Sequence, residues 1–346
     1  MKHCMSGKKR IIAAAESSRG NGMDICLIGD LCADLLLPYG NVKGHLKQLE
    51  TGTVDYSEVV FQYGGTCGNS SAVLGKLGAH PYFVTDLCTD QIGRYLKQCM
   101  EEQGVDMSLA METPGKSNMI CIAVIDENNE RIIFAWLPPG SDYPKFSAEN
   151  LSRIPETEPL LVFTGGMVMN NDPDSMDAVC EKIERLKQAG STIVFDLNAR
   201  AENYGMNPER KAAFERMIQA SDIVIGSGPE EFNAVTGEAS MERSIQKMLK
   251  PGKTVIARDG KEPVIVACGD SRTAVPTESV QVLQTIGAGD TFNGAFLFGL
   301  NEGLNVEQAV LFANGIAAYM VSTPGHLAVP ENVKERLEQA RNSAVK

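Results

Sequence analysis

Short apolar runs of strand length recur along the chain, and most of them are separated by segments with helical periodicity. The first run, at residues 24–29, ends in a glycine. The later runs lie at 82–85, 160–164, 192–197, 223–225 and 254–257. Strands that alternate with helices form βαβ units, so this pattern predicts an α/β fold with a mostly parallel sheet covered on both faces.

The segment between two of these runs shows the helical period directly. Its apolar positions, spaced by three or four residues, are Met176, Val179, Cys180, Ile183 and Leu186. Charged residues occupy the opposite face, and Gly190 follows the last apolar position. We therefore expect an amphipathic helix that ends at this glycine.

Two stretches break the alternation. Residues 119–125 and 131–136 are strand-like halves joined by the turn-rich segment 126–130, which predicts a hairpin. Residues 34–61 lack a helical period and end in a strand-like run. We expect these two stretches to form a small sheet outside the main core, and the last 16 residues to form a polar helix.

Length and charge limit the possible classes of protein. At about 150 residues per domain, 346 residues correspond to two domains or to one large α/β domain with an insertion. The formal net charge of -12 argues against binding to nucleic acid, which relies on Lys and Arg to neutralise phosphates. No apolar run approaches the roughly 18 residues of a membrane-spanning helix, so we expect no membrane association through such a helix.

Cysteine and histidine spacing argues against metal-centred chemistry. The nine cysteines are scattered and never stand in C-x-x-C spacing, and the four histidines form no i, i+4 pair. This predicts neither a zinc site nor a disulfide framework, and it favours a reducing cytoplasm.

The first 22 residues differ from the rest of the sequence. They hold five basic residues against one acidic residue, and their apolar piece is too short for a secretory signal. We expect a disordered basic leader, and Met23 is an alternative start.

The most informative motif is T-I-G-A-G-D-T-F-N-G-A-F at residues 285–296. Small residues at Gly287, Ala288 and Gly289 let backbone N–H groups approach an anion at the start of a helix. Asp290 follows directly and can take a proton from a hydroxyl that attacks a phosphoryl group. Alternatively, the segment is a glycine turn with Asp290 as a capping residue. Phe292 stands where a dinucleotide fingerprint would need glycine.

A near match to a phosphate-binding P-loop at residues 110–117 precedes a strand rather than a helix, so we expect an ordinary loop there.

A second glycine-rich motif begins a helix. Gly64 and Gly65 precede a segment that closes at Gly78, and Asn69 lies near its start. The Asn69 amide can hydrogen-bond a polyol there. The alternative is a close-packed helix start with no ligand.

Two acidic motifs follow strands. The sequence D-L-N-A-R at residues 196–200 stands at a strand end, the edge where open α/β sheets bind ligands. The sequence G-P-E-E-F at residues 228–232 begins a helix. Acidic residues at such positions also act as caps without any ligand.

Together, these motifs resemble the ribokinase-like (PfkB) family of carbohydrate kinases from about residue 23 to about residue 330. The resemblance implies a three-layer α/β/α core with a small β-sheet lid. It implies a single kinase domain at 23–346, with the lid formed by about 34–63 and 115–137. The implied activity is ATP-dependent phosphorylation of a primary hydroxyl of a small sugar.

The resemblance also implies roles for individual residues. Asp290 is the catalytic base, and Gly287, Ala288 and Gly289 form the anion hole. The expected substrate contacts are Asp34, Gly64, Gly65 and Asn69, with Arg131 and Trp136 on the lid hairpin. The expected ATP contacts are Asp196, Asn198, Arg200, Arg258, Gly260 and Asn314, and Glu231 is the expected Mg²⁺ residue.

The sequence departs from the family pattern at several positions. Gly228 replaces an Asn in the motif tied to hydrated magnesium. Gln284 replaces an Asp that helps bind a monovalent cation, which argues against potassium activation. Cys32 and Thr66 replace Asn and Lys of ribokinases proper, so ribose is not favoured.

These departures leave several substrates open. A neutral ketose such as fructose fits the motifs, and so does a keto-deoxy sugar acid whose carboxylate would pair with Arg131. Trp136 could stack on a base, which keeps a nucleoside kinase as an alternative. Gly228 and Gln284 also allow a catalytically silent sugar- or nucleotide-binding protein. The exposed edges of the lid favour a homodimer through the lid, and lid closure would exclude water.

Overall fold

The computed structural model describes residues 23–38, 58–115, 117–125, 131–137, 144–169 and 172–343. The expected leader at 1–22, the lid connection at 39–57 and the hairpin turn at 126–130 lie outside these residues.

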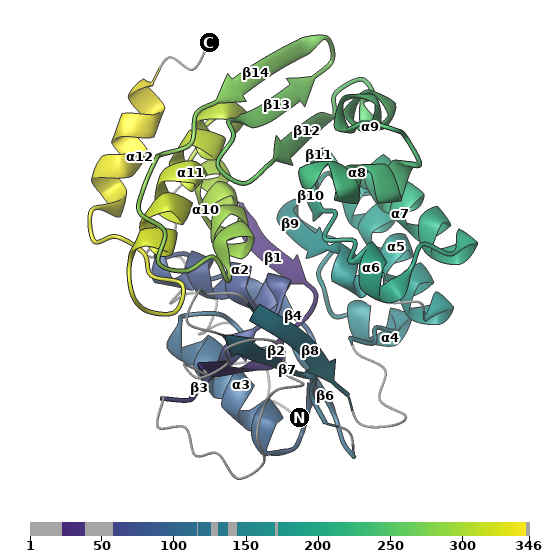
Figure 1. Cartoon of the computed structure of the whole chain (residues 1–346). Helices are drawn as coiled ribbons and strands as arrows, with labels where there is room; N and C mark the ends of the chain where they lie inside the picture. Colours follow the sequence, from purple (N-terminus) through teal and green to yellow (C-terminus); the bar gives the residue numbers. More distant parts are fainter. Residues whose placement is uncertain are drawn as a thin grey trace, which may run out of the picture.

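An eight-stranded sheet forms the centre of the molecule, in the order β14-β13-β12-β11-β10-β9-β1-β4 (Figure 1). Its strands are β1 (Asp24–Ile28), β4 (Tyr82–Val84), β9 (Leu160–Gly165), β10 (Thr192–Asp196), β11 (Ile223–Ser227), β12 (Thr254–Arg258), β13 (Val264–Cys268) and β14 (Ser271–Val275). Neighbours from β4 to β12 are parallel, whereas β13 and β14 add an antiparallel edge. The mostly parallel sheet predicted from the apolar runs is thus confirmed.

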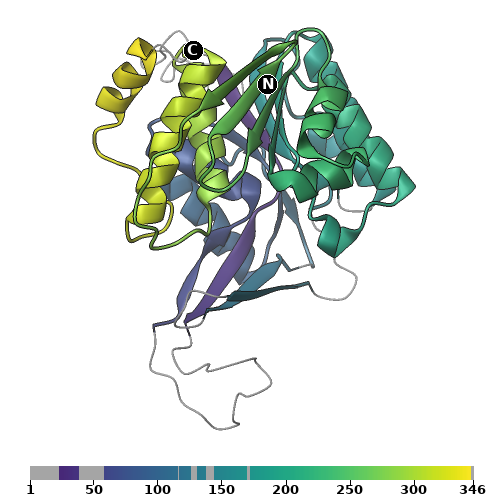
Figure 2. The same cartoon turned by 45° about the horizontal axis from the view of Figure 1, so that its top comes forward.

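Helices cover both faces of this sheet and enclose two separate apolar cores (Figure 2). One core includes residues of α2 (Thr66–Lys76), α3 (Gln91–Glu102), α10 (Ala288–Asn301), α11 (Val306–Ser322) and α12 (Val333–Asn342). The other includes residues of α4 (Ala148–Leu151), α5 (Pro173–Gln188), α7 (Pro208–Ala220), α8 (Gly228–Thr236) and α9 (Met241–Met248). Two short pieces, η2 (Gly166–Val168) and α6 (Ala201–Tyr204), follow β9 and β10. This arrangement is the expected three-layer α/β/α core.

The predicted amphipathic helix is α5. It begins where the Asp172 side chain accepts a hydrogen bond from the Ser175 amide at 3.2 Å, with Pro173 in the first turn. Its apolar face, Met176 to Leu186, is buried against the sheet. It ends at Gln188, two residues before Gly190.

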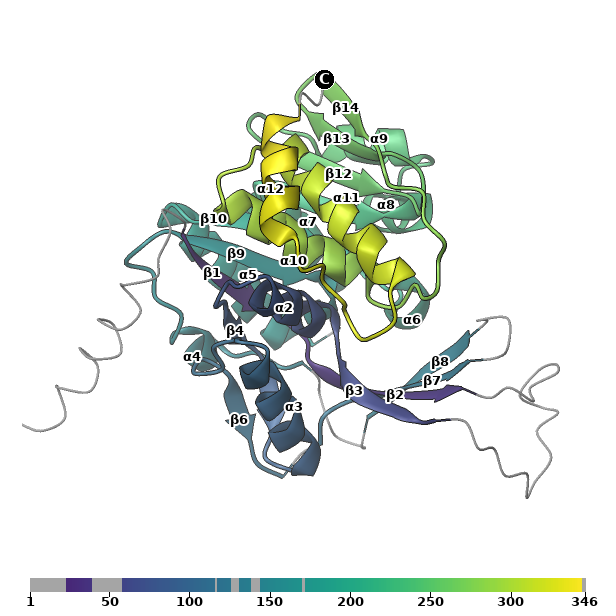
Figure 3. The ribbon, with the colours of Figure 1, turned by 90° about the vertical axis from the view of Figure 1, so that its left-hand side faces the viewer.

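A second sheet projects from the core as a lid (Figure 3). It has the order β3-β2-β7-β8, with β2 (Cys32–Pro38), β3 (Val60–Gly64), β7 (Ile120–Ile125) and β8 (Arg131–Trp136). The predicted hairpin is β7–β8, and β2 pairs with β7 in parallel. Since only three residues separate the end of β1 from the start of β2, one segment of chain passes directly from the core into the lid.

The remaining strands, β5 (Asp86–Cys88) and β6 (Met111–Thr113), pair in parallel. β6 lies within the near P-loop match, and the next described element is β7 rather than a helix. None of the described helices combines the length and apolarity needed to cross a bilayer.

Candidate active site

A cavity of about 1250 Å³ lies between the lid sheet and the carboxyl ends of the main strands. This edge is where open α/β sheets bind ligands. Most of the predicted site residues line it: Asp34, Gly65, Asn69, Asp196, Asn198, Arg200, Glu231, Arg258, Gly287, Ala288, Gly289 and Asp290.

The start of α10 forms the side of the cavity where the sequence predicts an anion hole. Gly287 caps the helix with φ 82°, and a Cβ there would lie 2.6 Å from the Leu327 side chain. Both features require glycine at this position. The first turn of a helix presents backbone N–H groups that lack intrahelical acceptors, together with the positive end of the helix dipole. The predicted anion hole is therefore geometrically possible at residues 287–289.

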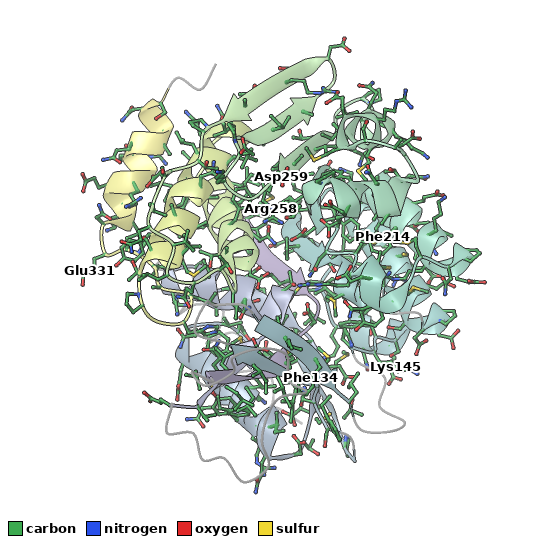
Figure 4. All side chains as sticks on the ribbon, viewed as in Figure 1. Phe134, Lys145, Phe214, Arg258, Asp259 and Glu331 are labelled. Carbon is green, nitrogen blue, oxygen red and sulfur yellow. The ribbon has the colours of Figure 1, made fainter. Side chains whose placement is uncertain are left out.

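Arg258 fastens this turn to the main sheet. Its Nη1 donates to the Gly289 carbonyl oxygen and to Asn293 Oδ1, each at 3.0 Å. Its Nη2 lies 3.3 Å from Asp196 Oδ2, and the guanidinium stacks 5.0 Å from the centre of the Phe292 ring. The Arg258 side chain is only 11% exposed and lies near the centre of the molecule (Figure 4). Arg258 thus positions the turn at residues 287–289 through contacts with the protein.

Asp290 lies in the first turn of α10 and faces α2. Asn69 Nδ2 donates to Asp290 Oδ2 at 2.7 Å, and Ser70 Oγ donates to the Asp290 backbone carbonyl at 3.1 Å. Burial raises the pKa of Asp290 to about 7, with Asp30 and Asp196 adding to the rise and the Asn69 hydrogen bond opposing it. A carboxyl with a pKa near neutrality can both accept and release a proton at physiological pH.

Asp30 is a site residue that the sequence analysis missed. It is 2% exposed, and its two oxygens accept hydrogen bonds from the Thr66 amide at 2.8 Å and the Cys67 amide at 3.2 Å. These bonds cap the start of α2, which carries Asn69. Gly65 has φ 91°, and a Cβ there would lie 2.9 Å from the Asp30 carbonyl oxygen. The position of Asp30 just after Gly29 at a strand end was the available signal.

Gly64 makes room for Asp34. A Cβ at Gly64 would lie 2.3 Å from atoms of the Asp34 carboxylate, because β2 and β3 are paired neighbours. Burial raises the pKa of Asp34 to about 6, with Asp30 adding to the rise and a Cys32 hydrogen bond opposing it. Gly64 is not among the residues that line the cavity, and its lack of a side chain leaves room for the Asp34 carboxylate.

Glu231 holds the loop that follows β10. Its Oε1 accepts from the Ala199 amide at 2.9 Å and its Oε2 from the Ser227 amide at 2.7 Å. The loop residues Asn198 and Arg200 have positive φ angles of 28° and 45°. Burial and the nearby Asp196 raise the pKa of Glu231 to about 7. Glu231 therefore fixes the loop that presents Arg200 to the cavity.

Gly228, which replaces the family's Asn, has φ 73°. Asn is among the few other residues that visit this region readily, so the replacement keeps the backbone and removes an amide.

Gln284 has specific partners in the structure. Its Nε2 donates to the Thr323 carbonyl oxygen at 3.2 Å and to the Gly325 carbonyl oxygen at 2.8 Å.

The structure does not bring four predicted residues into the cavity lining. They are Gly64, Gly260, Asn314 and Trp136. Asn314 instead donates to the Pro276 carbonyl oxygen at 2.8 Å, and the Trp136 side chain is 62% exposed. The Arg131 side chain lies outside the described residues.

On the lid, the cavity is lined by residues that the sequence analysis did not assign to the site: Cys32, Met119, Cys121, Ile133, Phe134 and Ala135. Phe134, on the lid in Figure 4, replaces Trp136 as the aromatic residue of this wall.

Comparisons with known proteins identify a family and a shared fold. The family described as "pfkB family carbohydrate kinase" matches residues 23–332. A 5-dehydro-2-deoxygluconokinase of Bacillus licheniformis is 29% identical over 306 residues, which are 86% of this chain and 90% of that protein. One of Shouchella clausii is 27% identical over 309 residues, covering 88% and 91%.

Solved structures share the fold. A fructokinase from Vibrio cholerae O395, with fructose, ADP and calcium ion bound, has a TM-score of 0.74 at 22% identity and covers 92% of this chain and 99% of its own. An aminoimidazole riboside kinase from Salmonella enterica, with its riboside and an ATP analogue, has a TM-score of 0.73 at 21% identity and covers 91% and 99%.

Proposed function

The chain belongs to the pfkB family of carbohydrate kinases, and from this premise we propose that it phosphorylates a primary hydroxyl of a keto-deoxy sugar acid, with Asp290 as the base. Sugar kinase activity follows from the family, and the residue roles and the substrate are our proposal. The observation that carries the proposal is the position of Asp290, with its pKa of about 7, between the anion-binding start of α10 and the Asn69 amide.

In this reaction, the sugar hydroxyl oxygen attacks the γ-phosphorus of ATP. The bond from that phosphorus to the oxygen of the departing ADP breaks, and the hydroxyl proton passes to an Asp290 carboxylate oxygen. The N–H groups of residues 287–289 offset the negative charge on the phosphoryl group. Asn69 and Asp34 orient the sugar, and the lid excludes water that would otherwise be phosphorylated.

Mg²⁺ fits the acidic end of the cavity. Glu231 and Asp196 are both cavity residues, and their mutual repulsion contributes to the raised pKa of Glu231. Two hard carboxylate oxygen donors that repel one another are suited to a divalent cation that keeps several waters. We assign Glu231 to hold hydrated Mg²⁺, which would neutralise the charge of the ATP phosphates.

Arg200 supports an anionic substrate. The described cationic residues that line the cavity are Arg200 and Arg258. Arg258 is engaged by Gly289, Asn293 and Asp196, whereas the Arg200 side chain is exposed to the cavity. Arg200 also acts electrostatically on Asp30 and on Asp290, the proposed base, which supports a role for its charge in this part of the cavity. There it can bind the transferred phosphate, and it can also pair with a sugar carboxylate. The relatives named 5-dehydro-2-deoxygluconokinase favour the acid.

An ADP-release assay with Mg-ATP tests the proposal. The panel comprises 5-dehydro-2-deoxygluconate, fructose and a purine nucleoside. We expect the acid to give the highest kcat/KM. A preference for fructose or the nucleoside would overturn the substrate assignment, and tight binding without turnover would show a catalytically silent protein.

The variant Arg200→Ala separates the two roles of this residue. If Arg200 binds the sugar carboxylate, its removal raises KM for the acid and leaves KM for ATP unchanged. If it binds the phosphate, KM for ATP rises or kcat falls with every sugar. Arg243→Ala, an exposed arginine on α9 outside the cavity lining, is the matched control.

We propose that the kinase works without potassium. The Gln284 amide donates hydrogen bonds to the carbonyl oxygens of Thr323 and Gly325. Its N–H groups thus interact with these two oxygens in the way that a bound cation would. Equal ADP release in potassium and in tetramethylammonium buffer is the expected result, and a requirement for potassium would refute it.

The lid supports a homodimer, which we also propose. Its exposed apolar side chains include Val60, Phe61, Ile132, Ile133 and Trp136. Lid strands with exposed edges and apolar surface are protected when a second subunit covers them. Light scattering that gives twice the chain mass supports the dimer, and a monomer at micromolar concentration contradicts it. A cytoplasmic location remains our prediction from the cysteine content.

A further inference from the structure

Three potential metal ligands meet on the lid side of the cavity. Cys32 and Asp34 lie on β2, and Cys121 lies on β7 directly opposite Asp34 in the parallel pairing. One ligand atom from each of the three residues lies within 4.8 Å of the other two. All three residues line the cavity. This cluster joins positions 89 residues apart, so no local sequence spacing reveals it.

Two of the three distances within the cluster match the edges of a tetrahedral zinc site, and the third, between Cys121 and Asp34, is within 4.8 Å. The two sulfur atoms, Cys32 Sγ and Cys121 Sγ, are 3.8 Å apart, and Cys32 Sγ is 3.4 Å from Asp34 Oδ1. With Zn–S bonds of about 2.3 Å and a Zn–O bond of about 2.1 Å, tetrahedral angles give an S–S edge of about 3.8 Å and an S–O edge of about 3.6 Å. Only small side-chain adjustments would therefore be needed to bring the three atoms onto one ion.

The surroundings favour a soft cation. Buried Cys32 packs with the buried Met119, and Cys121 and Leu137 pack against them, so the site is rich in sulfur. Thiolates select thiophilic metals such as zinc over magnesium.

We propose that Cys32, Asp34 and Cys121 form a binding site for a thiophilic divalent cation, with Zn²⁺ as the first candidate, and that the cation and the sugar exclude one another. Each coordinating thiol releases its proton to solvent, and the fourth position of the tetrahedron remains for water. The exclusion rests on the proposed function, in which Asp34 contacts the sugar. The binding of the cation does not depend on it.

Cobalt absorption tests the site without any enzymatic readout. The full-length protein, reduced with a phosphine and kept free of oxygen, is titrated with Co²⁺ while thiolate-to-cobalt charge-transfer absorption is recorded. Zn²⁺ is then added to displace the cobalt. We expect one equivalent of absorbing Co²⁺ that Zn²⁺ bleaches and millimolar Mg²⁺ does not. Absence of the band, or bleaching by Mg²⁺, would overturn the proposal.

Variants locate the ion. Cys121→Ser and Cys32→Ser are each expected to weaken Co²⁺ binding by at least about 10-fold. Even the loss of a residue that only hydrogen-bonds to a metal ligand weakens metal binding by about 10-fold or more, and the loss of a ligand should cost at least as much. Cys268→Ser, an exposed cysteine at the end of β13, is the matched control and should bind like the parent protein. Circular dichroism verifies that each variant is folded. If the band survives both site variants, or is lost in Cys268→Ser, the cation binds elsewhere.

Competition tests the exclusion separately. The preferred sugar from the kinase panel should weaken Co²⁺ binding, and Zn²⁺ should raise the apparent KM for the sugar in the parent protein far more than in Cys121→Ser. Undiminished cobalt binding at saturating sugar would refute the exclusion. If no sugar is phosphorylated, the kinase assignment fails while the cobalt titration still decides the metal site.

Discussion

The two sides of the cavity, to which we assign the phosphate and the sugar in our proposal, are built in different ways. The phosphate side consists of backbone at the start of α10, fixed by Arg258 and by the paired helices α2 and α10. At Gly294 these helices approach so closely that a Cβ would lie 2.7 Å from the Ser70 carbonyl oxygen. The sugar side consists of side chains on the lid, where Ile133 and Phe134 remain largely exposed.

This difference separates chemistry from selectivity. A phosphoryl group is the same in every reaction of a kinase family, so a rigid backbone seat suits it. A sugar differs from one kinase to the next, and side chains on a separate sheet can change without disturbing the seat. Substitutions on the phosphate side should therefore act mainly on kcat, and substitutions on the lid side mainly on KM for the sugar.

Asp290→Asn gives the largest expected effect and tests the phosphate side. We expect kcat to fall by about 10²- to 10⁴-fold with KM for the sugar little changed, because a positioned base contributes this much. The folded-state pKa of Asp290 lies above its ordinary value, so its ionisation destabilises the fold progressively as pH rises from about 4 to about 7. Asp290→Asn should therefore raise the midpoint of thermal unfolding at pH 8.

The control for this experiment is Asp270→Asn, in the exposed turn between β13 and β14, which should change neither kcat nor the thermal midpoint. If Asp290→Asn keeps a kcat close to that of the parent protein, Asp290 is not the catalytic base.

Gly64→Ala tests the sugar side through the backbone. The added Cβ would overlap the Asp34 carboxylate, so Asp34 must move. Loss of a hydrogen bond to a charged group costs about 1.5–3 kcal/mol, which predicts a rise of roughly 10- to 100-fold in KM for the sugar. KM for ATP should not change.

Asp34→Asn completes a double-mutant cycle with Gly64→Ala. If both changes act through the same carboxylate, their effects on KM for the sugar will be far from additive. Additive effects would show that Gly64 matters for another reason.

The pH profile tests the contact between the two helices of the phosphate side, because Asn69 on α2 donates a hydrogen bond to Asp290 on α10. The base must be ionised, so kcat/KM should rise with pH and level off above about 7. The Asn69 hydrogen bond lowers the pKa of Asp290, so Asn69→Ala should move this acid limb to higher pH. Ser71→Ala, whose hydroxyl bonds within α2 to the Cys67 carbonyl oxygen, should leave the limb in place. If Asn69→Ala does not shift the pH at which kcat/KM rises, a group other than Asp290 is responsible for this titration.

More of the residues predicted for the phosphate side than of those predicted for the lid line the cavity, because the phosphate-side residues are contiguous in the sequence. The turn at 287–289 and Asp290 form one local motif, whose chemistry can be recognised without knowing the fold. The parallel sheet and the hairpin β7–β8 also follow from local periodicity. The edge strand β14 was missed because its sequence, S-R-T-A-V, contains no apolar run.

Long-range pairing accounts for the residues that were missed. Cys32 and Cys121 meet only because β2 pairs with β7, and Asp30 caps a helix that begins 36 residues later. Trp136 was expected in the site as the lone tryptophan, yet Phe134 lines the cavity. Which residues of a lid strand line the cavity depends on how the lid sits over the core, and this is a tertiary property.

Phe134→Ala and Trp136→Ala form a matched pair with the smallest expected effects, and they test which lid positions contact the sugar. Both aromatic side chains lie on β8 and are partly exposed, but only Phe134 lines the cavity. Loss of its apolar contact should raise KM for the sugar by about 2- to 10-fold, equivalent to about 0.5–1.5 kcal/mol. Trp136→Ala should change this KM by less than about 2-fold and should instead weaken self-association in light scattering, since Trp136 is not among the residues that line the cavity and is 62% exposed. The reverse result would show that the lid closes in a register that brings Trp136, rather than Phe134, over the sugar.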